Sequence, residues 1–194
     1  SIGTLGIKLN GKILKSVLTS PDTIFLHQAL EKINKNKVDN VIIEASSHGL
    51  HQQRLNHLNI KAGIFTNFSQ DHLDYHKSMK SYFNAKMILF KSILTKKKTI
   101  ISDSSIKEFA YLERISKKRN LHLIDINNLK NRLYQNKKVN FLNDFQLKNL
   151  SMAISAAKLC NLSEKKIVNV IGRLKDVNGR LEHVRTFPNN IKVF

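Results

Sequence analysis

The sequence has little cysteine and no long apolar run, and each shortage narrows the possible classes of protein. The single cysteine, Cys160, cannot form a disulfide within the chain, which fits a reducing compartment. The apolar runs near residues 41–45 and 60–65 are far shorter than the roughly 20 residues that a membrane-spanning helix needs. The N-terminal stretch also lacks the apolar region of a secretory signal. We therefore expect a cytoplasmic protein that has no membrane partner.

Acidic residues are also scarce. The sequence has 14 Asp and Glu residues and 33 Lys and Arg residues, which gives a formal net charge of +19. In a domain of this size such an excess raises nucleic acid as a partner. Lysines outnumber arginines 26 to 7, however, and they are scattered over the expected helix surfaces instead of forming one stripe. We interpret the charge as a solvated basic surface that favours polyanions such as nucleotides, and we expect no nucleic-acid partner. A basic nucleic-acid-binding module is the alternative from a different class.

The chain of 194 residues, 41% hydrophobic, is long enough for one domain with a sizeable core. Short β-type runs alternate with longer helix-type runs, which predicts an α/β fold with a mainly parallel sheet flanked by helices. The predicted strands are residues 38–45, 61–67, 99–103 and 121–125. The predicted helices are residues 22–34, 78–94, 104–119, 147–159 and 163–174. The polar segment 127–141 is predicted to form a hairpin or edge strands, and the protein is expected to be a monomer.

Small polar residues follow the first predicted strand, VIIEASSHGL, which ends in Glu44. In open parallel sheets, ligands bind beyond the carboxyl ends of the strands, so Ser46, Ser47 and His48 are candidates for a binding site. A helix beginning at this point would offer backbone N–H groups to an anion. The plainer interpretation is that Ser46 caps a helix and that His48 packs in the core.

The next predicted strand leads into FTNFSQDHLDYH, in which Asp71, His72, Asp74 and His76 lie close together. Carboxylates and imidazoles at this density indicate metal or phosphate chemistry. In the helix that follows, Lys86 lies on or beside the apolar face. A lysine in such a position, taken alone, more often extends its ammonium group to solvent.

The strings EASSHGLHQQR, GIFTNFSQDHLDYH and NAKMILF, in this order and spacing, resemble the central domain of Mur ligases. His72 and Lys86 are 14 positions apart, as in that family, and SSHGL and DHLDYH resemble its MurE branch. The resemblance implies an ATP-dependent ligase that adds the third amino acid to UDP-MurNAc-L-Ala-D-Glu through an acyl phosphate, in peptidoglycan synthesis. The third residue is expected to be meso-diaminopimelate, with lysine as the alternative. Folylpolyglutamate synthase or a sister Mur ligase is the nearest alternative enzyme.

The resemblance also implies roles for individual residues. Glu44 and His72 correspond to Mg²⁺ ligands, and Lys86 corresponds to a lysine that the family carries as a carbamate, so these three form the expected catalytic and metal site. Carbamylation needs a neutral amine, which partial burial favours by lowering the lysine pKa. The expected contacts with the muramoyl-peptide substrate are Thr19, Ser20 (where the family has a second threonine), Ser46, Gln52 and Arg54. Asn149 and Arg180 are the expected contacts with ATP.

The chain departs from the family pattern in two places. The segment NDFQLKN stands where the family reads GxFNxxN, so that Asn143 replaces the glycine and Gln146 the first asparagine, which puts the adenine contacts in doubt. The glycine-rich GKT phosphate loop of the family is absent, and we expect it just before Ser1; Gly3 and Gly6 cannot substitute for it. We expect residues 1–180 to form the central ATP-binding domain and 181–194 to begin the link to a C-terminal ligase domain. The isolated chain is predicted to be inactive.

Overall fold

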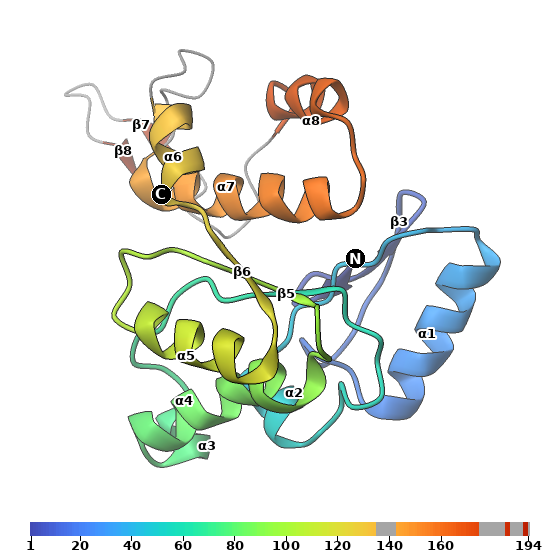
Figure 1. The fold of residues 1–194 in the computed structure, drawn as a ribbon. Helices are drawn as coiled ribbons and strands as arrows, with labels where there is room; N and C mark the ends of the chain where they lie inside the picture. The colour runs from blue at the N-terminus through green and yellow to red at the C-terminus, as the bar shows by residue number, and fades with distance from the viewer. Residues whose placement is uncertain (135–142, 175–184, 187–191, 194) are drawn as a thin grey trace. The chain divides into compact units, whose positions relative to one another are not determined.

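A computed structural model describes residues 1–134, 143–174, 185–186 and 192–193 of the chain (Figure 1). The chain divides into two compact units, Ser1–Ala156 and Ala157–Phe194. None of the helices in these described ranges is long and apolar enough to cross a membrane. The candidate site residues that the structure describes all lie in the first unit.

The first unit contains a three-stranded parallel sheet, as predicted. Its strands are β4 (Ala62–Ile64), β5 (Thr99–Ser102) and β6 (His122–Asp125), in the order β4-β5-β6. Every residue of the central strand β5 is buried, and Ile100 and Ile101 have no exposed surface. The strand reads Thr-Ile-Ile-Ser, so its two polar ends are buried together with its isoleucines.

Helices cover one face of this sheet (Figure 1). Helix α5 (Phe109–Arg119) buries Leu112 and Ile115 and packs against β5 and β6. Helix α4 (Met79–Ile88) contacts the short helices α2 (Ser47–His51) and α3 (Leu73–His76), and continues into a π-helix, η1 (Leu89–Ile93). The predicted helix at 78–94 is therefore confirmed, although its last turn is wider than an α-helical turn. Gly63 lets β4 approach this turn closely, because a Cβ at that position would lie 2.9 Å from Phe90 Cε1.

A second, antiparallel sheet forms at the N-terminus and was not predicted from the sequence. It consists of β1 (Ile2–Gly3), β2 (Gly6–Leu9) and β3 (Lys12–Leu14), in that order. Helix α1 (Thr23–Lys35) follows, with Asp22 as its cap, and it buries Leu26, Ala29 and Ile33 at helical spacing. The predicted helix at 22–34 is thus confirmed.

The predicted strand at 38–45 is wrong in its extent. Among the described residues, this segment makes only one parallel bridge, between Ile2 and Ile43, supported by hydrogen bonds from Ile2 N to Ile42 O (2.9 Å) and from Glu44 N to Ile2 O (2.8 Å). Strand β1 is two residues long and then turns into β2, so it offers the segment no longer pairing partner. The pairing depends on the partner strand, which the apolar run itself does not encode.

Two further predictions need correction. Residues 127–134 form helix α6 (Asn127–Tyr134) instead of a hairpin or edge strands, while 135–142 lie outside the described residues. Helix α5 begins at Phe109 and not at residue 104. Residues 104–108 instead form turns with i→i+3 bonds, from Ile106 N to Asp103 O (3.2 Å) and from Phe109 N to Ile106 O (3.2 Å).

Helix α7 (Asp144–Leu159) begins in the first unit and reaches the second. The second unit contains α8 (Glu164–Ile171), whose Ser163 cap accepts the N–H of Lys166, and an antiparallel pair, β7 (Arg185–Thr186) and β8 (Lys192–Val193). The predicted helices at 147–159 and 163–174 are confirmed with small shifts of their ends.

Candidate active site

Ser20 connects the segment before α1 to the segment that leads into α2. Its hydroxyl donates a hydrogen bond to the carbonyl of Glu44 (2.8 Å) and accepts bonds from the N–H (2.9 Å) and the hydroxyl (3.0 Å) of Ser46. The Ser46 hydroxyl in turn accepts the N–H of Gly49 (3.1 Å), which caps α2. The cap predicted for Ser46 is confirmed, and three of the expected site residues are joined directly.

The Glu44 carboxylate is held from one side by the β1–β2 turn. Glu44 Oε2 accepts the backbone N–H and the hydroxyl of Thr4, both at 2.8 Å, and the Thr4 hydroxyl lies 3.2 Å from that of Thr19. A Cβ at Gly3 would lie 2.7 Å from the same oxygen, so glycine leaves the space that the carboxylate occupies. Glu44 is exposed. The expected metal ligand Glu44 and the expected substrate contact Thr19 therefore share one surface.

Arg54 and Gln52 lie beside this group. Arg54 Nη1 donates to the carbonyl of Ser20 (2.7 Å), and Arg54 Nη2 donates to Gln52 Oε1. Gln52 Nε2 donates to the Tyr75 hydroxyl at 3.1 Å, which is also 2.9 Å from His51 Nδ1. The guanidinium is thus fixed next to the Ser20 and Glu44 group and keeps further N–H donors for a ligand.

Helices α2, α3 and α4 bring together a cluster of imidazole and phenol rings. Its members are His48 and His51 from α2, His72, Tyr75 and His76 from the α3 region, and Tyr82 from α4. The His48 ring lies 4.1 Å from that of Tyr75 and 5.0 Å from that of His72, centroid to centroid. Residues from two sequence motifs therefore meet in one place, as their positions after neighbouring predicted strands suggested.

Two histidines of this cluster are held towards the neutral form. Burial lowers the pKa of His48 below its ordinary value, and the neighbouring His72 adds to the effect. Burial likewise lowers the pKa of His76, whose Nε2 lies 2.9 Å from the buried Ser47 hydroxyl. Since His76 and Ser47 are 4% and 3% exposed, they support the site from within and do not face a ligand.

His72 and Lys86 converge on Tyr82. The His72 ring packs edge-on against the Tyr82 ring at 5.7 Å, and Lys86 Nζ lies over the same ring at 5.1 Å. Asp71 lies 3.5 Å from His72 Nε2, and it also accepts the backbone N–H of His72. Burial lowers the pKa of Lys86, which the charge of Asp71 opposes. His72 precedes α3 and has a left-handed backbone (φ 53°).

Glu44, His72 and Lys86 are not joined to one another by any direct interaction in the described structure. His72 and Lys86 share Tyr82 and Asp71, whereas Glu44 belongs to the group around Ser20. Within the described ranges, no group of three or more His, Cys, Asp or Glu side chains could hold a metal ion. The expected ligand set of Glu44, His72 and Lys86 contains only two side chains of those types.

The two departures at the start of α7 form a reciprocal cap. Asn143 Oδ1 accepts the N–H of Gln146 (2.8 Å), and Gln146 Oε1 accepts the N–H of Asn143 (3.3 Å), the pattern of a capping box. The side chains that replace the family's glycine and asparagine thus have a structural role in this chain. Asn149, the expected ATP contact, is exposed one turn into the helix.

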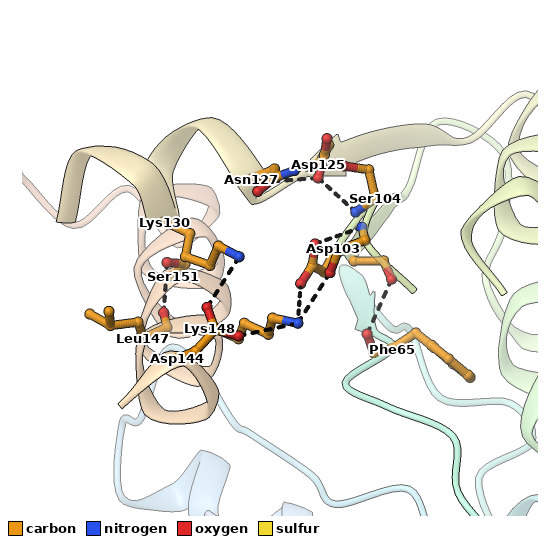
Figure 2. Close-up of polar contacts among 12 residues, drawn as sticks. Phe65, Asp103, Ser104, Asp125, Asn127, Lys130, Asp144, Leu147, Lys148 and Ser151 are labelled. Carbon is orange, nitrogen blue, oxygen red and sulfur yellow. Dashed lines mark hydrogen bonds and ion pairs between the residues drawn. The ribbon is translucent and has the colours of Figure 1, made fainter. Parts of the chain in front are cut away.

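A charged network fixes the first turns of α7 to the ends of β5 and β6 (Figure 2). Asp103 is fully buried, and Lys148 Nζ lies 3.1 Å from its Oδ2, as an ion pair without the alignment of an ordinary hydrogen bond. Lys148 also donates to the Ser105 hydroxyl (3.1 Å) and lies 3.5 Å from Asp144 Oδ2. Lys130 of α6 pairs with the other oxygen of Asp144 at 3.3 Å.

The charges of this network support one another. Burial alone would raise the pKa of Asp103. Hydrogen bonds from Ser105, together with the contact and positive charge of the nearby Lys148, outweigh burial and lower that pKa. Its interaction with Asp103 raises the pKa of Lys148 against the effect of burial. Neither residue was predicted from the sequence, where Lys148 resembles the many exposed lysines and Asp103 a residue at the end of a strand.

Arg180 and the segment around it lie outside the described residues. Tyr82 and Thr4 were also missed as site residues. Tyr82 belongs to the predicted helix at 78–94, and Thr4 precedes Glu44 by 40 positions and reaches it through the β1–β2 turn.

Comparison with known proteins identifies a family. The family model described as Mur ligase middle domain matches residues 1–171. Proteins named UDP-N-acetylmuramoyl-L-alanyl-D-glutamate–2,6-diaminopimelate ligase are similar to most of the chain. The one from Rickettsia bellii is 33% identical over 95% of this chain and 44% of its own length. The one from Aquifex aeolicus is 35% identical over 91% of this chain and 41% of its own length. A solved structure titled as the same ligase has a TM-score of 0.72 at 23% identity, covering 95% of this chain and 42% of that one, and shows the same fold.

The chain therefore spans less than half the length of the curated relatives that it matches. The family model covers more than four-fifths of the chain, including both site motifs and the start of α7. The expected resemblance is confirmed: this chain belongs to the Mur ligase family and carries its middle domain.

Proposed function

We propose that this chain is the central, ATP-binding domain of a cytoplasmic ligase that joins meso-diaminopimelate to UDP-MurNAc-L-Ala-D-Glu. In this proposal residues 1–180 form that domain, and residues 181–194 begin a link to the amino-acid-recruiting domain. The observation that carries the proposal is similarity along 91–100% of the chain to relatives named for this reaction. Because the chain covers 41–44% of their length, the activity is proposed for a protein that also supplies the other parts.

The proposed reaction has two chemical steps. The D-glutamyl side-chain carboxylate attacks the γ-phosphorus of ATP, so that ADP leaves and an acyl phosphate forms. The amine of the diamino acid then attacks the acyl carbon, inorganic phosphate leaves, and an amide bond forms. Phosphoryl transfer of this kind depends on positioning and on compensation of negative charge more than on covalent chemistry by the protein.

The geometry supports a division of roles between the two groups of residues. Thr19, Glu44 and Arg54 surround Ser20, and Arg54 offers a planar cation for forked recognition of a phosphate or carboxylate. We assign substrate recognition to Thr19, Ser46, Gln52 and Arg54. The exposed Asn149, on a helix held to the end of the parallel sheet, is assigned to ATP together with Arg180.

Glu44, His72 and Lys86 would hold the Mg²⁺ ion of this reaction. The donor set fits a hard cation if Lys86 carries a carbamate, because an ammonium cannot ligate a metal whereas a carbamate offers oxygen donors. Burial, which lowers the pKa of Lys86, favours the neutral amine that reacts with CO₂. When bound, Mg²⁺ would compensate negative charge on the phosphoryl group and the substrate carboxylate.

The test is made with the complete gene product that contains this chain, supplied with ATP, Mg²⁺, UDP-MurNAc-L-Ala-D-Glu and meso-diaminopimelate. Lys86→Ala is expected to abolish ligation and to leave binding of the UDP-substrate largely intact. Lys91→Ala is the matched control, since Lys91 Nζ lies over a different ring, that of Tyr111, at the same 5.1 Å that separates Lys86 from Tyr82. A ¹³C carbamate signal from labelled bicarbonate should disappear only in Lys86→Ala.

Three outcomes would contradict parts of the proposal. Turnover by Lys86→Ala at the parental rate would remove the carbamate from the mechanism. Faster turnover with lysine than with meso-diaminopimelate would change the third residue. Turnover with a folate substrate, and none with the UDP-dipeptide, would favour the folylpolyglutamate-type alternative.

A further inference from the structure

The Ser20 hydroxyl has no hydrogen-bonding capacity left for a ligand. A serine hydroxyl has one O–H donor and two acceptor lone pairs. In this chain the O–H is donated to Glu44 O, and both lone pairs accept, one from the N–H and one from the O–H of Ser46. The residue is also 0% exposed. Ser20 was expected to touch the muramoyl-peptide substrate, but its side chain can do so only if these bonds are broken.

The bonds of Ser20 fix the segment that presents Glu44. The Glu44 carbonyl and the Ser46 N–H lie on either side of Ala45, and both bind the same Ser20 oxygen. Glu44 N is bonded to Ile2 O at 2.8 Å, so the backbone of this residue is held at both its amide and its carbonyl. With the backbone fixed, the carboxylate is directed to the Thr4 and Thr19 side of the site.

The same bonds set the start of α2. The donors run in one direction, from Gly49 N–H to the Ser46 hydroxyl, from that hydroxyl to Ser20, and from Ser20 to the Glu44 carbonyl. Chains of this kind polarise and strengthen their members. The packing is close, because a Cβ at Gly49 would lie 2.6 Å from Ser20 Cβ, so the first turn of α2 rests directly on Ser20.

We propose that Ser20 is a positioning residue, which sets Glu44 for its role and whose side chain does not itself contact the substrate. The proposal rests on the proposed function, because it names how that site is held. Its physical basis is independent of any ligand: one buried hydroxyl saturates its capacity by joining the Thr19–Ser20 segment to the end of the 42–46 segment and to α2. The carbonyl of Ser20 extends the same support to Arg54.

The first test needs no catalysis and no variant. Hydrogen exchange is measured on the parent protein without nucleotide, UDP-substrate or Mg²⁺. The amide of Ser46 is expected to be protected already in this state, because its partner is Ser20 and not a ligand. A Ser46 amide that exchanges as an unprotected group in the free protein, and becomes protected only with the UDP-substrate, would overturn the proposal.

The second test compares Ser20→Ala and Ser20→Thr in the complete gene product, with Ser116→Ala as the matched control. Ser116 is 5% exposed and donates to Glu113 O at 2.8 Å within α5, so its change removes a buried serine hydroxyl outside the site. Ser20→Ala is expected to reduce kcat or the apparent affinity for Mg²⁺ by about 10-fold to 100-fold, the usual effect of losing a group that supports a metal ligand. KM for the UDP-substrate should change by less than about 3-fold, and Ser20→Thr, which restores the hydroxyl, should recover most of the loss.

The outcomes separate this proposal from the proposed function. A rise in KM for the UDP-substrate with unchanged kcat and Mg²⁺ dependence would make Ser20 a direct contact, and a Ser20→Ala enzyme that matches the parent would leave it no role. If Ser20→Ala does not fold, the exchange of Ser46 in the parent and the kinetics of Ser20→Thr decide. A parent protein with a protected Ser46 amide and no ligase activity would support the positioning role and reject the reaction.

Discussion

Replacement of Lys148 by methionine should destabilise the protein far more than the loss of an ordinary surface lysine. Lys148 is 25% exposed and its partner Asp103 is 0% exposed, so Lys148→Met leaves a buried carboxylate without its counter-ion. Breaking a buried pair from one side costs about 3–5 kcal/mol. The N–H of Ser105 still supports the other oxygen of Asp103, at 2.9 Å, so we expect the lower end, about 3 kcal/mol.

A second lysine in the chain provides the matched control. Lys117 lies 3.1 Å from Glu113, the same separation as Lys148 from Asp103, but these side chains are 74% and 47% exposed. Exposed pairs of this kind contribute about 0.3–0.5 kcal/mol, so Lys117→Met should have a small effect. Any larger loss in Lys148→Met therefore reflects burial and not the distance between the charges.

The assay is urea denaturation followed by far-UV circular dichroism, since the chain has no tryptophan to report by fluorescence. The double variant Asp103→Asn/Lys148→Met should be less destabilised than the sum of its single changes, because the second change removes the unpaired charge. The loss in Lys148→Met should also shrink at acid pH, where Asp103 becomes neutral. A Lys148→Met free energy of unfolding within about 0.5 kcal/mol of that of Lys117→Met would refute the reasoning.

Two further predictions concern the same part of the molecule. Because the folded-state pKa of Asp103 is lowered, its contribution to stability is present above the unfolded pKa of about 3.9 and is lost as the pH falls through the lower folded value. Urea midpoints of the parent should therefore fall more steeply with acid than those of Asp103→Asn. Parallel curves would contradict this prediction. Asn143→Ala should cost about 1 kcal/mol by removing the cap of α7, measured by the same denaturation, whereas Asn149→Ala, a change of the same type on an exposed face of that helix, should cost clearly less.

Local sequence patterns were sufficient for the elements that depend on burial along their own length. Helix α1 buries Leu26, Ala29 and Ile33 at helical spacing, so its apolar periodicity predicted it, and the short Ile-containing run of β5 marked a strand that is buried at every residue. The site motifs were also recognisable, because His72 and Lys86 stand at a family-like spacing. Their convergence on Tyr82 could be expected only in outline.

Elements that depend on a distant partner could not be predicted in the same way. The segment 38–45 has the composition of a strand, but its pairing is limited by the two residues of β1. Helix α6 has few apolar residues, and its polar sequence gave no clear period. The Asp125 side chain binds the N–H of Ser104, a backbone group 21 positions earlier that only the folded chain brings near.

The sequence by itself determined the family and the parallel α/β core and named most residues of the candidate site, because these follow from contiguous motifs and from periodic burial. Only the tertiary structure decided how the site is held. It assigned Ser20 a buried place with its hydroxyl fully engaged, attached Glu44 to Thr4 across 40 residues of sequence, and paired Asp103 with Lys148. These interactions join segments far apart in the chain, and no local pattern encodes a hydrogen bond or an ion pair whose partner is chosen by folding.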